Sequence, residues 1–462
     1  MKICLVTAFP PSGRQLNEYG LHLARELRRN PFVNLTILGD RLTDYDWATD
    51  EHGNPLPTDQ RKELEGFRVV RCWESNSPGA PLHIARVVHR IQPDVVWFNL
   101  VYSTFATHAH PVVAFAGLCT PALTRSLGFF THVTLHQIVE RVDLASAGVK
   151  QERVFRIGSY LATKALLMAN SVTVLLPGYR QTLVGKYQAR NVLLGTHGTF
   201  TSCPTPPDFS LRGNPDHRLL AIGHWGTYKR LETLMEAIPA VLRRVPSARL
   251  IIAGSNHHTR PGYWESIREK YGPNPRIEFR GYIPEDAIPE LFRTSSIVIL
   301  PYDSATGSSG PAHLACEYGV PIVSADISDF RDMAANEDMS ISFYKIGDPV
   351  DLAAQIIGLL ESPQDQRRAA EQNYSAAIRM TMPHVVRHYM RWFELERRKQ
   401  TLNPPVRNLF SRLRRRRASL RAALHTFPPS NFRDGLLQPM LGPDTPSKVS
   451  DSPPATLRSE ES

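Results

Sequence analysis

The chain has 462 residues, of which 42% are hydrophobic and 21% charged, and 54 Lys and Arg outnumber 44 Asp and Glu. At about 150 residues per domain, this length predicts two or three domains with cores of their own and excludes a disulfide-stapled miniprotein or a wholly disordered chain. The five cysteines are scattered and form no Cys-x-x-Cys pair, which predicts reduced thiols in the cytoplasm and no cysteine metal site.

The chain shows neither a leader nor a membrane span. Residues 1–9 (MKICLVTAF) carry one lysine and too short an apolar run for a signal peptide. The longest apolar stretch, 111–130, is interrupted by Pro121 and Arg125, whereas a membrane span needs about 20 uninterrupted apolar residues, so we expect a buried helical segment there. Residues 401–462 are basic and then rich in Pro and Ser, which predicts a largely disordered tail.

Short apolar runs alternate with longer helical stretches up to about residue 380, on both sides of a turn-rich segment at 202–215. Several runs are almost continuously apolar, as in strands of a parallel sheet that is covered on both faces. The strands expected before the segment are 2–7, 33–38, 67–72, 95–98, 133–135 and 172–176, with helices at 19–29 and 152–169. Those expected after it are 219–222, 250–253, 277–279, 297–300, 322–324 and 341–343, with helices at 231–245, 263–271, 288–294, 312–318 and 351–360.

This alternation predicts an α/β fold of two tandem, Rossmann-like, doubly wound domains facing a central cleft. We place the domains at 1–205 and 206–384, followed by a helix over 385–400 and the tail 401–462. Ligands of such sheets bind beyond the carboxyl ends of the strands, so the cleft between the domains is the expected site.

The first strand-to-helix turn, 9–14, has the sequence Phe-Pro-Pro-Ser-Gly-Arg. Gly13 would let the backbone approach a phosphate at the start of the following helix, while an ordinary Pro/Gly turn is an equal alternative. The turn has no Gly-x-Gly-x-x-Gly fingerprint, which argues against a dehydrogenase.

The second domain opens with a strand that runs into Ile222-Gly-His-Trp-Gly-Thr-Tyr-Lys-Arg. Two cations at the carboxyl end of a parallel strand can face a diphosphate and stabilise charge on its leaving oxygen. We therefore take Lys229 and Arg230, with Gly223 and His224 before them, as candidate donor-binding residues. A solvated surface pair is the alternative.

A loop of glycines and hydroxyl residues, 301–310, links the strand that ends at Leu300 to a short helix. Ser308 or Ser309 can cap this helix, and Pro311 suits its first turn. Hydroxyl and backbone N–H groups then converge at the positive end of the helix dipole, where a nucleotide phosphate fits, unless the segment is a plain flexible loop. The candidate ligands are Thr306, Ser308, Ser309 and Gly310.

With these motifs, about residues 1–400 resemble a family 4 glycosyltransferase of the GT-B fold. The resemblance implies metal-independent transfer of a sugar, with retention, from a nucleotide-diphosphate donor in the second domain to a hydroxyl acceptor on the first. It implies no cofactor besides this donor, and it makes Lys229 the phosphate-binding lysine and His136 the histidine that reaches the sugar. The segments that carry it are 133–137 (VTLHQ), 197–198 (HG), 223–229 (GHWGTYK), 279–284 (FRGYIP) and 319–326 (GVPIVSAD).

Three positions depart from the family pattern. His224 replaces an arginine, Gly13 is all that remains of a glycine pair, and Thr306 and Leu314 stand where two glutamates are expected. Glu317, one helical turn after Leu314, becomes the candidate for the ribose hydroxyls, with a salt-bridged or surface glutamate as the alternative. The missing carboxylates motivate a second hypothesis, a non-catalytic subunit that binds a sugar nucleotide or a partner. A sugar-nucleotide epimerase ranks last, because no cluster of histidines and carboxylates is evident.

Outside the expected cleft, His257 and His258 have no third ligand, so we expect no metal there. Leucines at helical spacing among the arginines of 407–424 predict either a helix on the anionic inner face of a membrane or a solvated tail. No aromatic residues alternate with these arginines, and nucleic acid is not expected as a partner. The acceptor remains open among a glycan, a lipid and a small molecule.

Overall fold

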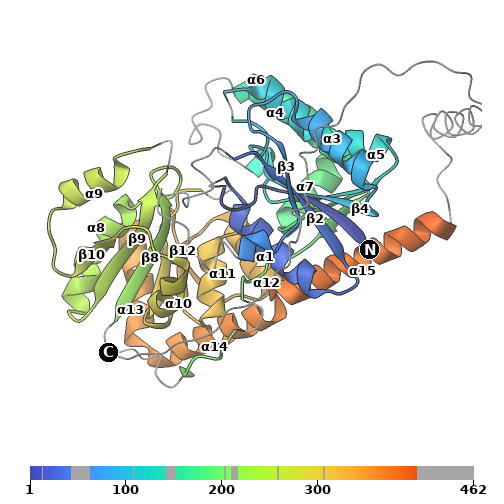
Figure 1. The fold of residues 1–462 in the computed structure, drawn as a ribbon. Helices are drawn as coiled ribbons and strands as arrows, with labels where there is room; N and C mark the ends of the chain where they lie inside the picture. The colour runs from blue at the N-terminus through green and yellow to red at the C-terminus, as the bar shows by residue number, and fades with distance from the viewer. Residues whose placement is uncertain are drawn as a thin grey trace, which may run out of the picture. The chain divides into compact units, whose positions relative to one another are not determined.

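The structure is a computed structural model that describes residues 1–12, 14–42, 63–107, 109–141, 152–201, 204–209, 217–257, 260–304 and 307–402. It contains two parallel sheets, each flanked by helices (Figure 1), which confirms the predicted α/β fold of two doubly wound units. Both sheets belong to one compact unit of the chain. The basic stretch 407–424 lies outside the described residues.

The first sheet has seven parallel strands in the order β3-β2-β1-β4-β5-β6-β7. Its order reverses between β1 and β4, where Ile3 pairs with Val95, and ligands of such sheets bind at this switch point. Every residue of β4 and β5 is buried, which explains why their apolar runs were recognisable in the sequence. The bounds are β1 Lys2–Val6, β2 Asn34–Asp40, β3 Val69–Trp73, β4 Val95–Leu100, β5 Phe130–Leu135, β6 Ser171–Val174 and β7 Val192–Leu194.

Helices cover both faces of the first sheet. The core on one face is shared with α1 and α15, and the core on the other with α3, α5, α6 and α7. The predicted buried segment 111–130 is instead two short helices, and α4 is largely exposed because it packs on other helices rather than on the sheet. The bounds are α1 Asn17–Arg29, α3 Ala80–Ile91, α4 Pro111–Leu118, α5 Thr120–Ser126, α6 Glu152–Leu166, α7 Pro177–Tyr187 and α15 Met382–Leu402.

The second sheet repeats the topology of the first, with six parallel strands in the order β10-β9-β8-β11-β12-β13. Its switch point lies between β8 and β11, where Ile297 pairs with Leu219. Gly254 has a φ of +109° and lies so close to Gly223 that any side chain would collide with the Gly223 carbonyl. The bounds are β8 Arg218–Trp225, β9 Arg249–Asn256, β10 Ile277–Arg280, β11 Ile297–Leu300, β12 Ile322–Ala325 and β13 Ile341–Tyr344.

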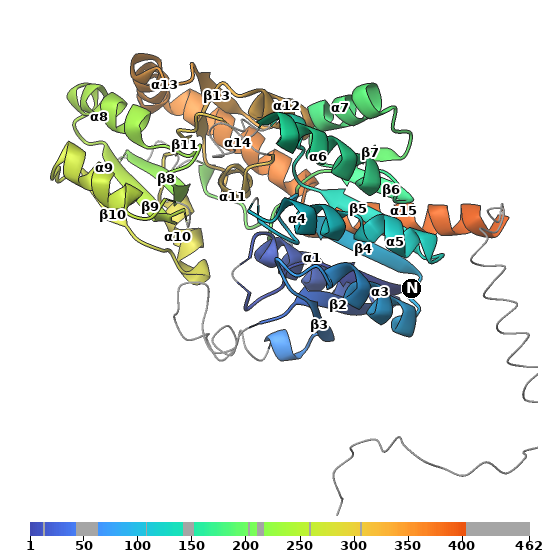
Figure 2. The same ribbon diagram turned by 90° about the horizontal axis from the view of Figure 1, so that it is seen from above.

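The helices of the second unit alternate with these strands (Figure 2). Among them α9 has the predicted bounds, whereas α12 and α14 were not anticipated. The bounds are α8 Glu232–Arg244, α9 Tyr263–Tyr271, α10 Ile288–Arg293, α11 Gly310–Glu317, α12 Ser328–Glu337, α13 Pro349–Glu361 and α14 Pro363–Arg379.

The last described helix, α15, returns to the first sheet. Tyr389 and Phe393 are buried against Trp97 of β4, with ring centroids 4.5 and 5.2 Å from the Trp97 ring. Thr381, just before the helix, forms a parallel bridge with Thr199. Among the described helices, none is long and apolar enough to cross a membrane.

Candidate functional site

The switch point of the second sheet holds Lys229. This residue follows β8 and forms an antiparallel bridge with Tyr302, which follows β11. Its ammonium lies 5.1 Å from the centre of the Tyr302 ring and 6.0 Å from that of Tyr228. Burial opposes the charged form, but attraction to the two tyrosine hydroxyls outweighs it, so the pKa of Lys229 is raised. Lys229 is therefore a fixed cation at neutral pH.

The glycine-serine loop lies beside this lysine. Ser309, one of the two predicted capping residues, accepts a hydrogen bond from the Ala312 N–H and caps α11, and Gly310 is its first helical residue. The Tyr302 hydroxyl is buried close to both Lys229 and Ser309, yet it makes no well-formed hydrogen bond among the described residues. The predicted cation and the predicted loop thus meet at one buried hydroxyl group that has unused hydrogen-bonding capacity.

The same loop contacts the end of β5 in the first unit. Gly307 has a φ of +102°, and a Cβ atom there would lie 2.5 Å from the carbonyl oxygen of His136. Its N–H donates to Oδ2 of Asp329 at 3.2 Å, and this oxygen also accepts from the Tyr179 hydroxyl at 2.7 Å. Only glycine fits this close approach.

We expect Gly307→Ala to lower the free energy of unfolding by about 1–3 kcal/mol, because alanine combines an unfavourable φ with a collision against backbone. Gly310→Ala is the matched control in the same loop, since a Cβ atom there meets open space. Thermal unfolding of both variants checks this expectation. Equal midpoints for the two variants would contradict the close packing of Gly307 on His136.

His136 ends a chain of polar contacts at the switch point of the first sheet. Its Nε2 lies 2.7 Å from Oδ1 of Asn99, whose amide donates to the Thr7 hydroxyl at 3.0 Å. Burial lowers the pKa of His136 to about 3, so its ring is neutral and Nε2–H donates to Asn99. The ring of Tyr19 packs edge-on against it, with centroids 4.6 Å apart. His136 is thus held in place as a neutral ring.

A buried cluster of histidines and a glutamate, which the sequence did not reveal, joins the two units. Oε2 of Glu337 lies 2.8 Å from Nε2 of His313, and Oε1 accepts from the His197 N–H at 3.3 Å. The other ring nitrogen of His313 lies 2.7 Å from the carbonyl oxygen of Ser309. Both ring nitrogens face acceptors, so the ring must carry both protons.

The charge of His313 follows from its surroundings. Burial lowers its pKa, but the Glu337 carboxylate more than compensates, and the pKa of His313 is raised. A buried imidazolium therefore lies directly beneath the capping residue Ser309. The expectation that no such cluster exists is wrong, because α11, α12 and the segment after β7 meet only in the folded chain. Its members are paired with one another, and this leaves no free acid or base of the kind an epimerase requires.

The remaining basic candidates near Lys229 are less suited to a diphosphate. Arg230 is half exposed and already pairs with Glu232 at 2.8 Å and with Asp303 at 3.6 Å. His224 is exposed, with Nδ1 2.9 Å from the Ser255 hydroxyl. Two carboxylates offset the charge of Arg230, so Lys229 is the principal cation at this switch point.

Glu317 is buried at the end of α11 and faces the segment that leaves β7. Its Oε2 accepts a hydrogen bond from the Thr201 N–H at 3.3 Å. Burial raises the pKa of Glu317 to about 7, although the N–H groups of Thr201 and Phe200 lower it in part. This carboxyl group ties the segment to α11, and its ribose-binding role stays a prediction.

Two candidates, Gly13 and Thr306, lie outside the described residues, as does His258. Within the described ranges, no three His, Cys, Asp or Glu side chains are grouped so that they could hold a metal ion. His313 and Glu337 are the site residues that the sequence reading missed. The one local signal for His313 is its position four residues after the capping serine, on the buried side of α11.

Two Rossmann-like halves of the same strand order, with a site drawn from the switch points of both, are the GT-B architecture. Residues 216–362 match the family model of the glycosyl transferases group 1. A 127-residue stretch is 27% identical to an uncharacterized glycosyltransferase of Methanocaldococcus jannaschii and covers 27% of this chain and 31% of that protein. The matched region thus spans less than a third of that relative.

Solved structures of similar fold include HepE of Anabaena in complex with UDP-glucose, with a TM-score of 0.59, 15% identity, and coverage of 85% of this chain and 99% of that one. Sucrose-phosphate synthase from Thermosynechococcus elongatus aligns with a TM-score of 0.64 and 13% identity over 86% and 98% of the two chains. At these identities the likeness establishes the fold. Together with the sequence match of the second half, it supports a GT-B glycosyltransferase.

Proposed function

We propose that this chain transfers a sugar from a nucleotide-diphosphate donor to a hydroxyl acceptor, with retention of configuration and without a metal ion. The observation that carries the proposal is the meeting of Lys229 and Ser309 at the buried Tyr302 hydroxyl. A cation, a capped helix start and an unsatisfied hydroxyl at a switch point suit a diphosphate. Because HepE was solved with UDP-glucose, we propose uridine diphosphate sugars as the first donors to test.

In the proposed mechanism the sugar–phosphate bond breaks while negative charge grows on the diphosphate. Lys229 and the backbone N–H groups at 308–310 stabilise that charge, and the buried imidazolium of His313 adds a positive charge behind Ser309. Arg230 contributes less than the sequence suggested, because Glu232 and Asp303 already neutralise it.

The acceptor hydroxyl attacks from the face that the diphosphate leaves, and its proton passes to the departing phosphate. The transferred sugar lies next to His136, whose neutral ring orients it by hydrogen bonding. No protein nucleophile is required. The order of events resembles that of the family rather than following from any bound ligand.

A second candidate, a non-catalytic subunit of the same fold, is favoured by one observation. The two family glutamates are replaced by Thr306 and Leu314, and Glu317 is engaged with the Thr201 backbone. Such a subunit would bind the nucleotide and transfer nothing.

Calorimetry with UDP, GDP and ADP, followed by incubation of the full chain with UDP-glucose in EDTA, separates the two candidates. Glycan, lipid and small hydroxylated acceptors are supplied in turn, and NMR of the anomeric proton reports hydrolysis, transfer and configuration. We expect UDP binding and slow release of α-linked product without metal. Binding without turnover of any donor would favour the non-catalytic subunit, and the absence of nucleotide binding would overturn both.

A further inference from the structure

The helix α4 is wholly apolar, yet its outer side is in contact with solvent. Its sequence, PVVAFAGL, contains no polar side chain. Val112 is 79% exposed and Phe115 39% exposed, because α4 packs on α3, α5 and α6 and not on the sheet. Exposed apolar surface of this kind on a folded protein usually marks an interaction site.

The neighbouring helix α6 extends this apolar surface. Ile157 and Leu161 are 64% and 49% exposed, and Met168, just beyond the helix, is 57% exposed. Arg153 and Lys164 are also exposed, and the spacing of four, four, three and four residues places all five on one side of the helix. The outer side of α6 is therefore an apolar stripe that carries cations.

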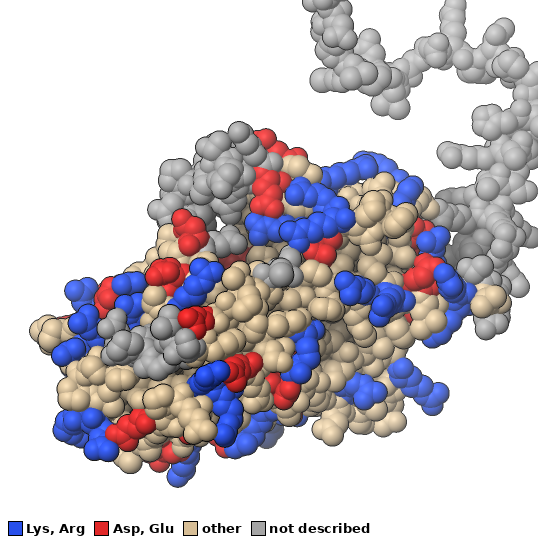
Figure 3. Space-filling view, turned by 90° about the horizontal axis from the view of Figure 1, so that it is seen from below, with Lys and Arg blue, Asp and Glu red and all other residues tan. Residues whose placement is uncertain are grey.

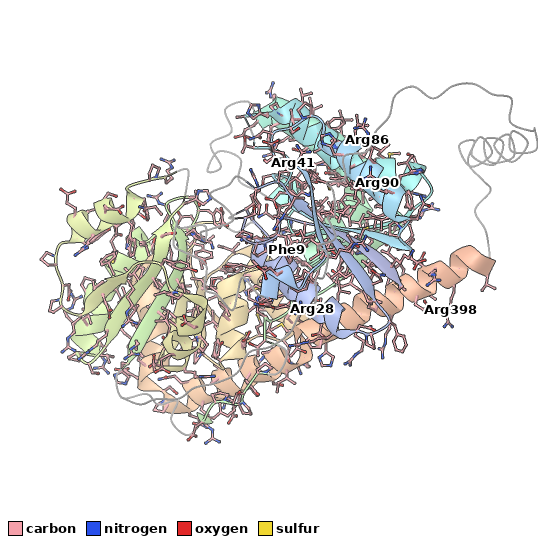
Figure 4. The ribbon with its side chains drawn as sticks, viewed as in Figure 1. Phe9, Arg28, Arg41, Arg86, Arg90 and Arg398 are labelled. Carbon is pink, nitrogen blue, oxygen red and sulfur yellow. The ribbon has the colours of Figure 1, made fainter. Side chains whose placement is uncertain are left out.

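Charge on these helices has one sign. The helices α3, α4 and α5 contain no Asp or Glu, and the one acidic residue of α6, Glu152, lies 3.7 Å from Arg156. Arg86 and Arg90 lie on the outer side of α3 (Figure 4). Figures 1 and 2 show α3, α4, α5 and α6 side by side on one side of the first sheet. The view from below, in contrast, shows basic and acidic residues intermixed (Figure 3).

One cation of this region has a structural task. Arg125 of α5 donates to the carbonyl oxygen of Ala169 at 3.2 Å and also contacts that of Met168, so it caps the end of α6. Arg86, Arg90, Arg153 and Lys164 form no ion pair with a carboxylate of the described residues. These four cations are available to a partner.

We propose that the outer face of α3, α4 and α6 docks on the surface of an anionic lipid membrane. The apolar side chains would enter the boundary between headgroups and acyl chains, while the surrounding cations contact anionic headgroups. A second copy of this chain fits less well, because a two-fold contact through this face would set cations against cations. The proposal concerns the described helices and does not depend on the tail 401–462 or on the proposed function.

The test is flotation of the full chain with vesicles of phosphatidylcholine alone and of equal parts phosphatidylcholine and phosphatidylglycerol. We expect binding to the anionic vesicles only, and about tenfold weaker binding for the double variant Val112→Gln/Ile157→Gln. Arg153→Gln/Lys164→Gln should weaken binding to a similar extent and reduce its dependence on salt. All substituted side chains are exposed, so the thermal midpoint and UDP affinity of each variant should equal those of the native chain.

Matched controls carry the same changes elsewhere. Phe32 and Val350 are 82% and 78% exposed, so Phe32→Gln/Val350→Gln removes similar exposed apolar surface at other places. Arg268→Gln/Lys270→Gln removes two cations from α9. Native-like binding by these controls, with weak binding by the α6 variants, supports the proposal. Equal binding of all variants, no binding of the native chain to anionic vesicles, or a dimer in solution that Val112→Gln/Ile157→Gln dissociates would each overturn it.

Discussion

We expect the Lys229→Met variant to bind UDP about 10- to 150-fold more weakly than the native chain, a loss of about 1.5–3 kcal/mol, which is typical for a hydrogen bond to a charged group. Methionine keeps the length and much of the volume of the buried side chain, so the contact with Tyr302 survives while the charge does not. Arg230 cannot compensate, because two carboxylates already hold its guanidinium. Calorimetric titration with UDP measures the effect.

Lys270 provides a close control for this change. Its ammonium also lies over a tyrosine ring, 4.8 Å from the centre of Tyr271, but it stands exposed on α9. Lys270→Met should therefore leave UDP affinity unchanged. If Lys229→Met and Lys270→Met bind UDP equally well, and as tightly as the native chain, Lys229 is not part of a diphosphate site.

The second large effect concerns pH and Glu317. Its pKa is about 7 in the folded chain because of burial, whereas an unfolded glutamate titrates near 4.5, so the native state holds this proton more tightly. The stability that it contributes is complete below the unfolded value and is lost as the pH rises through 7. The loss amounts to about 3 kcal/mol if the whole shift is realised.

Glu317→Gln should abolish this loss, because the amide oxygen still accepts from the Thr201 N–H and carries no charge to bury. The variant should gain stability relative to the native chain between pH 5 and 8, and the difference between their thermal midpoints measures that gain at each pH. The titration of His313 is common to both proteins and cancels. Glu290→Gln, at an exposed position of α10, is the control.

A difference in midpoint that does not change with pH would show that Glu317 titrates normally and is not desolvated. The same variant also addresses ligand binding. If Glu317 binds the ribose, UDP affinity falls in Glu317→Gln, and if it serves only to tie Thr201, UDP affinity stays native.

The sequence alone was sufficient for the α/β fold, because buried parallel strands must be apolar along their whole length. The strand β11 and the helix α9 have the predicted bounds, and Ser309 caps α11 as its spacing before Pro311 suggested. These features depend on neighbours within about one turn or one strand, and such local signals are visible in a linear sequence. The three-residue strand β7 is too short to give such a signal.

The tertiary structure alone decided how the candidate residues are partnered. Glu337 lies 24 residues from His313 and 140 from His197, and no local pattern announces that one carboxylate serves both. The pairing of Arg230 with Asp303, the tie between Glu317 and Thr201, and the exposure of α4 have the same origin. Burial and charge pairing depend on distances through space, and these distances exist only once both sheets have folded.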